Sequence, residues 1–183
     1  MTVEDQDPIA LTRRWLERAV IGLNLCPFAK AVHAKGLIRF VLSEATTPEV
    51  LLEELVAELA SLRDADPQTT DTTLLIHPQV LNDFIDYNDF LDAADAAIEA
   101  LDLGGVLQVA SFHPDYQFAG TAPDDIGNYS NRSPFPTLHL LREASVSRAA
   151  DTLPDADGIV DRNLATLEKL GHHAWRELLS KDG

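Results

Sequence analysis

The chain has 183 residues, of which 45% are hydrophobic and 24% are charged, an ordinary balance for one globular domain spanning residues 1–183. Its formal net charge of −16 argues against a nucleic-acid partner and against anionic membrane surfaces, because both need a basic face. We find no secretory signal and no apolar stretch long enough to span a bilayer. Cys26 is the only cysteine, so an intrachain disulfide is excluded and we expect a cytoplasmic protein.

The first third of the chain predicts helices and a strand. Residues 9–25 have the apolar periodicity of an amphipathic helix. Pro27 should end or kink that helix and begin a short new one, which would place Cys26 at its N-cap. Residues 37–42 alternate like a strand, and a helix with a wide apolar stripe is expected over residues 47–62.

The rest of the chain continues this alternation of strands and helices. The strands that we expect are residues 72–76, 106–112 and 137–141, and the helices run from Asp86 or Asn88 to residue 101, over residues 145–153 and over residues 159–179. This order predicts an α/β fold with a small mixed sheet of about four strands, covered by helices, and with helical N- and C-termini. The last two strands are expected to pair antiparallel.

The long segment between the last two strands, residues 113–136, is where we expect the functional site. Loops of this length inside a compact domain are usually lids or binding loops. Ligands of open α/β sheets bind beyond the carboxyl ends of strands, and His77 and His113 both follow such ends, each before a proline. A disordered linker is the poorer interpretation, because the segment carries four large aromatic residues, Tyr116, Phe118, Tyr129 and Phe135.

Four stretches of sequence are specific in combination. They are VIGLNLCPFA at 20–29, HP at 77–78 with DYN at 86–88, VASFHPDYQF at 109–118 and NRSPFPTLHLLRE at 131–143. Together they resemble an uncharacterised bacterial protein family of unknown function, and the resemblance covers most of the chain. It implies no activity, and adds only that five candidate residues lie inside the family's signature strings: Cys26, His113, Asp115, Arg132 and His139.

Cys26 is a candidate nucleophile. A thiol at a helix N-terminus faces unsatisfied N–H groups and the positive end of the helix dipole, which stabilise the thiolate. We therefore expect Cys26 to be partly accessible with a depressed pKa. The alternative is a buried cysteine that acts as a small hydrophobic residue between Leu25 and Phe28.

A divalent transition metal is the cofactor that the histidines suggest. His113, Asp115 and His139 could together bind one face of such an ion and leave positions open. The alternative is a turn in which Asp115 accepts backbone hydrogen bonds, while His139 packs within a strand.

The loop also carries candidate ligand-binding residues. Arg132 could clamp the carboxylate or phosphate of a small anionic molecule, with Asn131, His77 and Tyr116 beside it. In so acidic a chain the alternative is ion pairing, in which the arginines of this region, Arg132 and Arg142, pair with Asp124, Asp125 or Glu143.

The function that these residues favour is a small-molecule enzyme with its pocket under the 113–136 loop. His113 would be the general acid or base, and Asp115 would orient it and raise its pKa. Arg132 would line the same cleft as the anion clamp, and Cys26 could be a nucleophile. The alternative is a non-catalytic accessory protein that binds a metal or another ligand.

Overall fold

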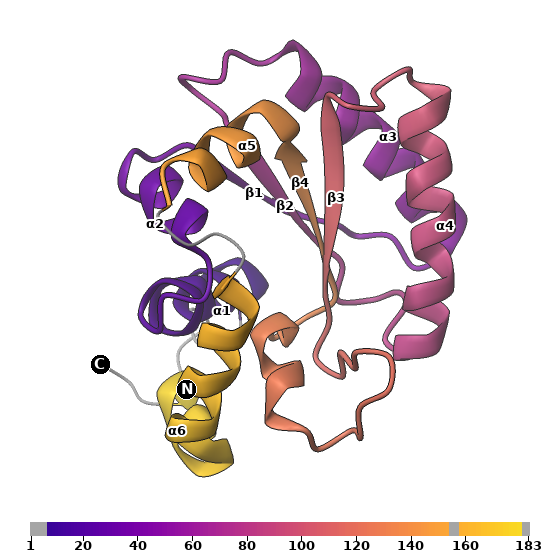
Figure 1. Ribbon diagram of the computed structural model, residues 1–183. Helices are drawn as coiled ribbons and strands as arrows, with labels where there is room; N and C mark the ends of the chain where they lie inside the picture. The colour runs from indigo at the N-terminus through magenta and orange to yellow at the C-terminus, as the bar shows by residue number, and fades with distance from the viewer. Residues whose placement is uncertain (1–6, 154–157, 181–183) are drawn as a thin grey trace.

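The computed structural model describes residues 7–153 and 158–180, and within them it confirms the α/β class with one mixed sheet and helices at both ends (Figure 1). The strands are β1 (Ile38–Leu42), β2 (Thr72–Ile76), β3 (Leu107–Phe112) and β4 (Thr137–Arg142). The helices are α1 (Pro8–Trp15), η2 (Leu16–Ile21), α2 (Pro27–Ala34), α3 (Pro48–Asp64), α4 (Phe84–Ala100), η3 (Ile126–Asn131), α5 (Glu143–Asp151) and α6 (Ile159–Ser180).

The sheet has the strand order β1-β2-β4-β3, so the last strand lies between β2 and β3. β1 and β2 pair parallel, whereas β4 pairs antiparallel with both β2 and β3, as expected for the last two strands. Because β4 is antiparallel to both neighbours, β2 and β3 run in the same direction. Their carboxyl ends, followed by His77 and His113, therefore lie at one rim of the sheet.

Helices cover both faces of the sheet (Figure 1). α3 and α4 cover one face, where α3 buries a leucine stripe against Leu75, Leu138 and Leu140 of the sheet. The side chain of Thr47 caps α3 by accepting from the Val50 N–H. α1, η2, α2 and α6 cover the other face in a second core, which contains Trp15, Ala19, Leu25, Leu167 and Trp175.

The N-terminal helix differs from the uniform helix predicted over residues 9–25. α1 passes into a π-helical segment, η2, in which Gly22 N–H donates to Glu17 O at 3.0 Å. The chain then turns through Asn24, whose φ is +55°, before α2 begins at Pro27. Apolar spacing identifies the buried face of this segment, but it does not distinguish α- from π-helical hydrogen bonding.

Two further boundaries depend on local hydrogen bonds. α4 begins at Phe84, because the Asp83 carboxylate accepts from the N–H groups of Ile85 and Asp86, so the predicted cap at Asp86 or Asn88 is wrong. α6 is broken at Gly171, where φ is +77°. Within the described residues, no helix is long and apolar enough to cross a membrane.

Candidate functional site

His77 and His113 meet at the rim where β2 and β3 end. Both are fully buried, and the Tyr87 ring lies between them, with centroid separations of 5.8 Å to His77 and 4.9 Å to His113. The Tyr87 hydroxyl donates to Thr137 O at 2.9 Å and accepts from Phe112 N–H at 3.0 Å. The hydroxyl therefore ties the ends of β3 and β4 together, a role that the sequence analysis missed.

Both ring nitrogens of His113 are used inside the protein. Nε2 lies 3.0 Å from Leu81 O, and Nδ1 accepts from the Asp115 N–H at 3.0 Å, so the imidazole is neutral and donates from Nε2. Burial lowers the pKa of His113, although the carboxylates of Asp115 and Asp83 act in the opposite direction. The expected rise in pKa is therefore wrong, and Asp115 bonds to the ring through its backbone rather than its carboxylate.

The side chains of His77 and Tyr116 also make their contacts with other residues of the protein. His77 Nδ1 donates to Val80 O at 3.0 Å, while its Nε2 is buried and has no hydrogen-bond partner among the described residues. Burial lowers the pKa of His77 to about 4. Tyr116 packs in an aromatic cluster, with ring centroids 5.2 Å from Phe84 and 4.9 Å from Phe118.

The expected metal site of His113, Asp115 and His139 is not assembled. Leu138 and Leu140 of β4 face the core under α3 and α4, so His139, which lies between them, faces the other side of the sheet. There His139 contacts Phe112, with ring centroids 5.9 Å apart, whereas His113 packs against Tyr87 of α4. Across residues 7–153 and 158–180, no three His, Cys, Asp or Glu side chains form a metal-binding group.

The surroundings of His139 are those of a structural residue. Its Nε2 lies 2.8 Å from Thr72 Oγ1, and that hydroxyl donates its hydrogen to Leu140 O at 2.5 Å. Nε2–H of His139 must therefore be the donor in the contact with Thr72. Burial lowers the pKa of His139 to about 4.

Cys26 is the N-cap residue of α2, as predicted, and it is partly accessible. Burial nevertheless raises the pKa of its thiol and outweighs the opposing hydrogen bonds from Ala29 and Phe28, so the expected depressed pKa is wrong. The residue lines both a small cavity of about 40 Å³, which His139 also lines, and a cavity of about 660 Å³. We call the larger one the apolar cavity; its lining includes Phe112, Ile126 and Leu164.

Arg132 lines a different cavity, of about 510 Å³, between α1, the 113–136 loop and α6. Its Nε donates to Tyr116 O at 3.1 Å and its Nη2 to Pro123 O at 2.5 Å, while its guanidinium carbon lies 4.5 Å from the centre of the Tyr129 ring. Loop carbonyls and an aromatic face thus fix the position of Arg132.

We call this second site the arginine cavity, because Arg14, Arg132 and Arg176 all line it. Its aromatic lining residues are Trp15, Tyr129 and Trp175. The described residues around it include no Asp, Glu, His, Lys or Cys. Trp15 is buried, and its Nε1 has no hydrogen-bond partner among the described residues.

The loop divides the predicted site residues between the two cavities. Arg132 lines the arginine cavity, and its neighbour Asn131 lines the apolar cavity. His113 lines neither, although Pro114 beside it reaches the arginine cavity. Arg14, Trp15, Trp175 and Arg176 were missed because α1 and α6 are distant in sequence; the adjacent arginine and tryptophan in each helix were the available signal.

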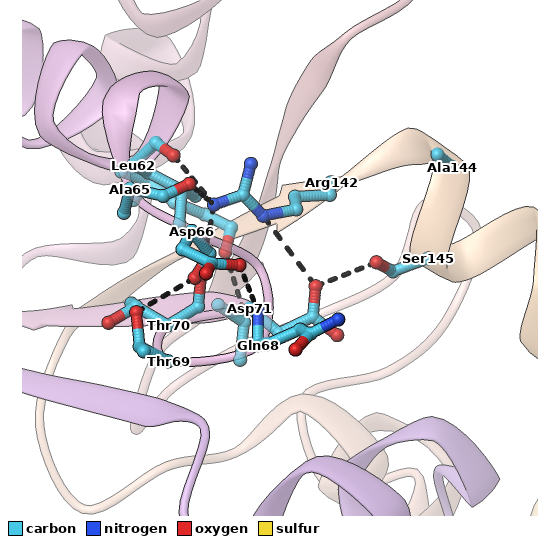
Figure 2. Close-up of polar contacts among 12 residues, drawn as sticks. Leu62, Ala65, Asp66, Gln68, Thr69, Thr70, Asp71, Arg142, Ala144 and Ser145 are labelled. Atoms are coloured by element: carbon cyan, nitrogen blue, oxygen red, sulfur yellow. Dashed lines mark hydrogen bonds and ion pairs between the residues drawn. The ribbon is translucent and has the colours of Figure 1, made fainter.

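Arg142, the other arginine considered for ion pairing, lies in a network at the opposite end of β4 (Figure 2). The two N–H bonds of its Nη2 are shared among three carbonyl acceptors, Leu62 O at 2.7 Å, Ala65 O at 2.9 Å and Thr70 O at 3.0 Å. Its Nε lies 3.6 Å from Asp71 Oδ1, which also accepts from Ser145 Oγ at 2.6 Å. The partner carboxylate is therefore Asp71 rather than Asp124, Asp125 or Glu143.

The chain belongs to the family described as Protein of unknown function (DUF1415), whose sequence profile matches residues 7–177. This confirms the resemblance to an uncharacterised family. No curated protein and no solved structure matches the chain.

Proposed function

We propose that this member of a family of unknown function binds a small anionic molecule with an apolar or aromatic body in the arginine cavity. One observation carries the proposal. In a chain with 30 acidic and 14 basic residues, the charged residues that line this cavity, among those described, are all arginines. A surface patch taken at random from so acidic a chain would be rich in carboxylates.

The guanidinium groups suit the charged end of such a ligand. Planar, forked N–H donors match carboxylate and phosphate oxygens. Arg132 is already fixed by Tyr116 O, Pro123 O and the Tyr129 ring, so less side-chain entropy is lost when it binds. Arg176 is exposed and reaches the cavity from α6, while Arg14, which has other interactions as well, reaches it from α1.

The remaining lining suits the body of the ligand. Tyr129 is half-buried and offers aromatic surface, the buried Trp15 and Trp175 contribute the edge of the lining, and Leu11 and Leu179 add aliphatic surface. A volume of about 510 Å³ is typical of cavities that enclose small molecules. An apolar lining with a few convergent polar groups is also typical of such sites.

Binding without turnover is supported better than an acid–base enzyme. The arginine cavity has no carboxylate, imidazole, thiol or amine among its described lining residues, and such a group is needed to move a proton near neutral pH. His113 has both nitrogens engaged and does not line the cavity.

The cytoplasmic location and the bacterial origin stay predictions.

Tryptophan fluorescence tests the proposal directly, because both tryptophans of the chain line the arginine cavity. Phenyl phosphate should change the emission saturably, whereas phenol, which lacks the anion, should bind far more weakly. Arg176→Gln should weaken phenyl phosphate binding about tenfold, as expected for loss of a charge-assisted hydrogen bond.

Arg63→Gln is the matched control, because it removes the same charge from α3, on the other side of the sheet. Raising the salt concentration should weaken the binding of phenyl phosphate and not that of phenol. Equal binding of phenol and phenyl phosphate, or equal losses in the two arginine variants, would refute the proposal.

A further inference from the structure

The apolar cavity lies on the other side of the segment that carries Arg132. Along η3 and the residues after it, Tyr129 and Arg132 line the arginine cavity, whereas Ile126, Ser130 and Asn131 line the apolar cavity. One short segment is therefore a wall shared by two cavities, of about 510 Å³ and about 660 Å³. Both volumes are typical of small-molecule sites.

The two cavities differ in the sign of their charge. Asp125 and Glu168 line the apolar cavity, and its described lining residues include no Arg, Lys or His. Both carboxylates belong to exposed residues, so they lie at its mouth. Phe118, Val160 and Leu164 line the same cavity and are also exposed, which surrounds the charged groups with apolar surface.

The two cavities also differ in their hydrogen-bonding character. In the apolar cavity the polar donors already bond within the protein: Asn131 Nδ2 donates to Ser111 O, and Asn163 Nδ2 donates to Leu25 O. The hydroxyls of Thr121 and Ser130 donate to Phe118 O and Gly127 O. What the cavity offers a ligand is acceptors. They are the Glu168 carboxylate, the amide oxygen of Asn163 and the Asp125 carboxylate, whose Oδ2 also accepts from the Ala122 N–H at 3.0 Å.

We propose that the apolar cavity binds a small apolar amine, with its ammonium group at Asp125 and Glu168 and its body against Phe112, Ile126 and Leu164. An ammonium has three donors and no acceptor, so it matches a site that presents acceptors. An anion in this cavity would face two carboxylates. The described lining residues include no Arg, Lys or His to offset that repulsion, so the cavity excludes anions. The inference is independent of the function proposed for the arginine cavity.

The position of Cys26 provides a readout. The thiol lines the apolar cavity from its inner side, with Val20 and Leu25, so a ligand seated there shields it from a small alkylating reagent. Three naphthalene compounds of similar shape separate charge from size: 1-naphthylmethylamine, 1-naphthalenemethanol and 1-naphthoate. In the intact 183-residue chain at mildly alkaline pH, the amine slows iodoacetamide alkylation of Cys26 most, the alcohol less, and the carboxylate least.

Variants test the contacts of the ammonium group. Glu168→Gln and Asp125→Asn each weaken amine binding roughly threefold to fivefold and leave alcohol binding unchanged. Glu53→Gln removes the same charge from an exposed position on α3 and leaves amine binding unchanged. Arg176→Gln also leaves it unchanged, which separates a failure here from a failure at the arginine cavity.

Isothermal titration of the same compounds and variants gives the affinities even where Cys26 reacts slowly. The proposal is overturned if 1-naphthoate binds or protects Cys26 as well as the amine does. It is also overturned if Glu53→Gln weakens amine binding as much as Glu168→Gln, because the amine would then bind the acidic surface at large. Amine binding that leaves the alkylation of Cys26 unchanged overturns it as well.

Discussion

Arg142 lies at the C-terminal end of β4 and Arg132 lies five residues before its N-terminal end, and the two arginines have contrasting surroundings. Arg142, at the end of the strand, donates hydrogen bonds from its guanidinium to three backbone carbonyls and faces the Asp71 carboxylate (Figure 2). Arg132, just before the strand begins, is held by two loop carbonyls and still lines a cavity, which it shares with Arg176. An arginine surrounded by protein acceptors holds the fold together, whereas one that lines a cavity can act on a ligand.

The difference arises from the backbone at each end. Arg142 meets the C-terminus of α3, where the last carbonyls of a helix are incompletely paired: Leu62 O accepts from the Ala65 N–H only at 3.3 Å, so it and Ala65 O are ready acceptors. Asp71 and Ser145 complete a buried polar set there. The arginine cavity instead lies between three separate elements, α1, the 113–136 loop and α6.

The largest expected effect is that of Arg142→Ala on stability. It removes a donor from three carbonyls and the cation beside the buried Asp71 carboxylate, which keeps its hydrogen bond from Ser145, and this should cost about 3–5 kcal/mol of unfolding free energy. Urea unfolding measures this loss, and Arg63→Ala, at an exposed site on α3, should change the free energy of unfolding little. A loss below about 1 kcal/mol would remove the distinction between the two ends.

Changing the pH tests the histidines while leaving every arginine charged. The pKa values of His77 and His139 fall from the ordinary 6.5 to about 4 on folding, so the unfolded chain binds more protons between these values. The contribution of these two neutral imidazoles to the free energy of unfolding is complete above pH 6.5 and is lost as the pH falls toward 4. Each of these two histidines should lower the free energy of unfolding by roughly 2 kcal/mol when the pH falls from about 7.5 to about 5.

Urea unfolding at the two pH values, in the wild type and in His139→Gln, measures this loss of unfolding free energy. The variant should lose less stability on acidification, because one of the three imidazoles whose pKa burial lowers is absent. His173→Gln is the control, since His173 is exposed on α6. Equal losses in the wild type and His139→Gln would show that His139 does not contribute.

Arg132→Ala should have an intermediate effect on stability. It removes two hydrogen bonds to carbonyls and the contact with the Tyr129 ring, but water can reach the freed acceptor at the exposed Pro123. We expect a loss of about 1–2 kcal/mol in urea unfolding. A loss as large as that of Arg142→Ala would make Arg132 a second structural clamp and weaken its assignment to the ligand.

Much of the fold could be predicted from periodicity. The leucine stripe of α3, the apolar β2 and the alternation of strands and helices indicated a mixed α/β sheet. What periodicity could not supply was hydrogen-bond detail, such as the π-helical turn of η2 and the capping of α4 by Asp83. Those features depend on individual donors and acceptors, not on the spacing of apolar residues.

The site was predicted less well, for a physical reason. Sequence order predicted a site at the 113–136 loop with Arg132, which lines the arginine cavity, but a residue's position in the chain does not say which face its side chain takes. His139 was expected beside His113, and the pleat of β4 sends it to the other face of the sheet. Burial, which no local motif reveals, lowers the pKa values of His77, His113 and His139 and raises that of Cys26.

Arg176→Gln should have the smallest effect on stability, below about 0.5 kcal/mol in urea unfolding, because Arg176 is exposed on α6. Its effect should appear in the binding of phenyl phosphate, where the lost guanidinium can no longer meet the anion. Arg176→Gln should therefore change stability little and affinity strongly. Arg142→Ala should do the reverse. A stability loss above about 2 kcal/mol with unchanged affinity would make Arg176 a clamp like Arg142, and the arginine cavity would then be part of the scaffold rather than a site.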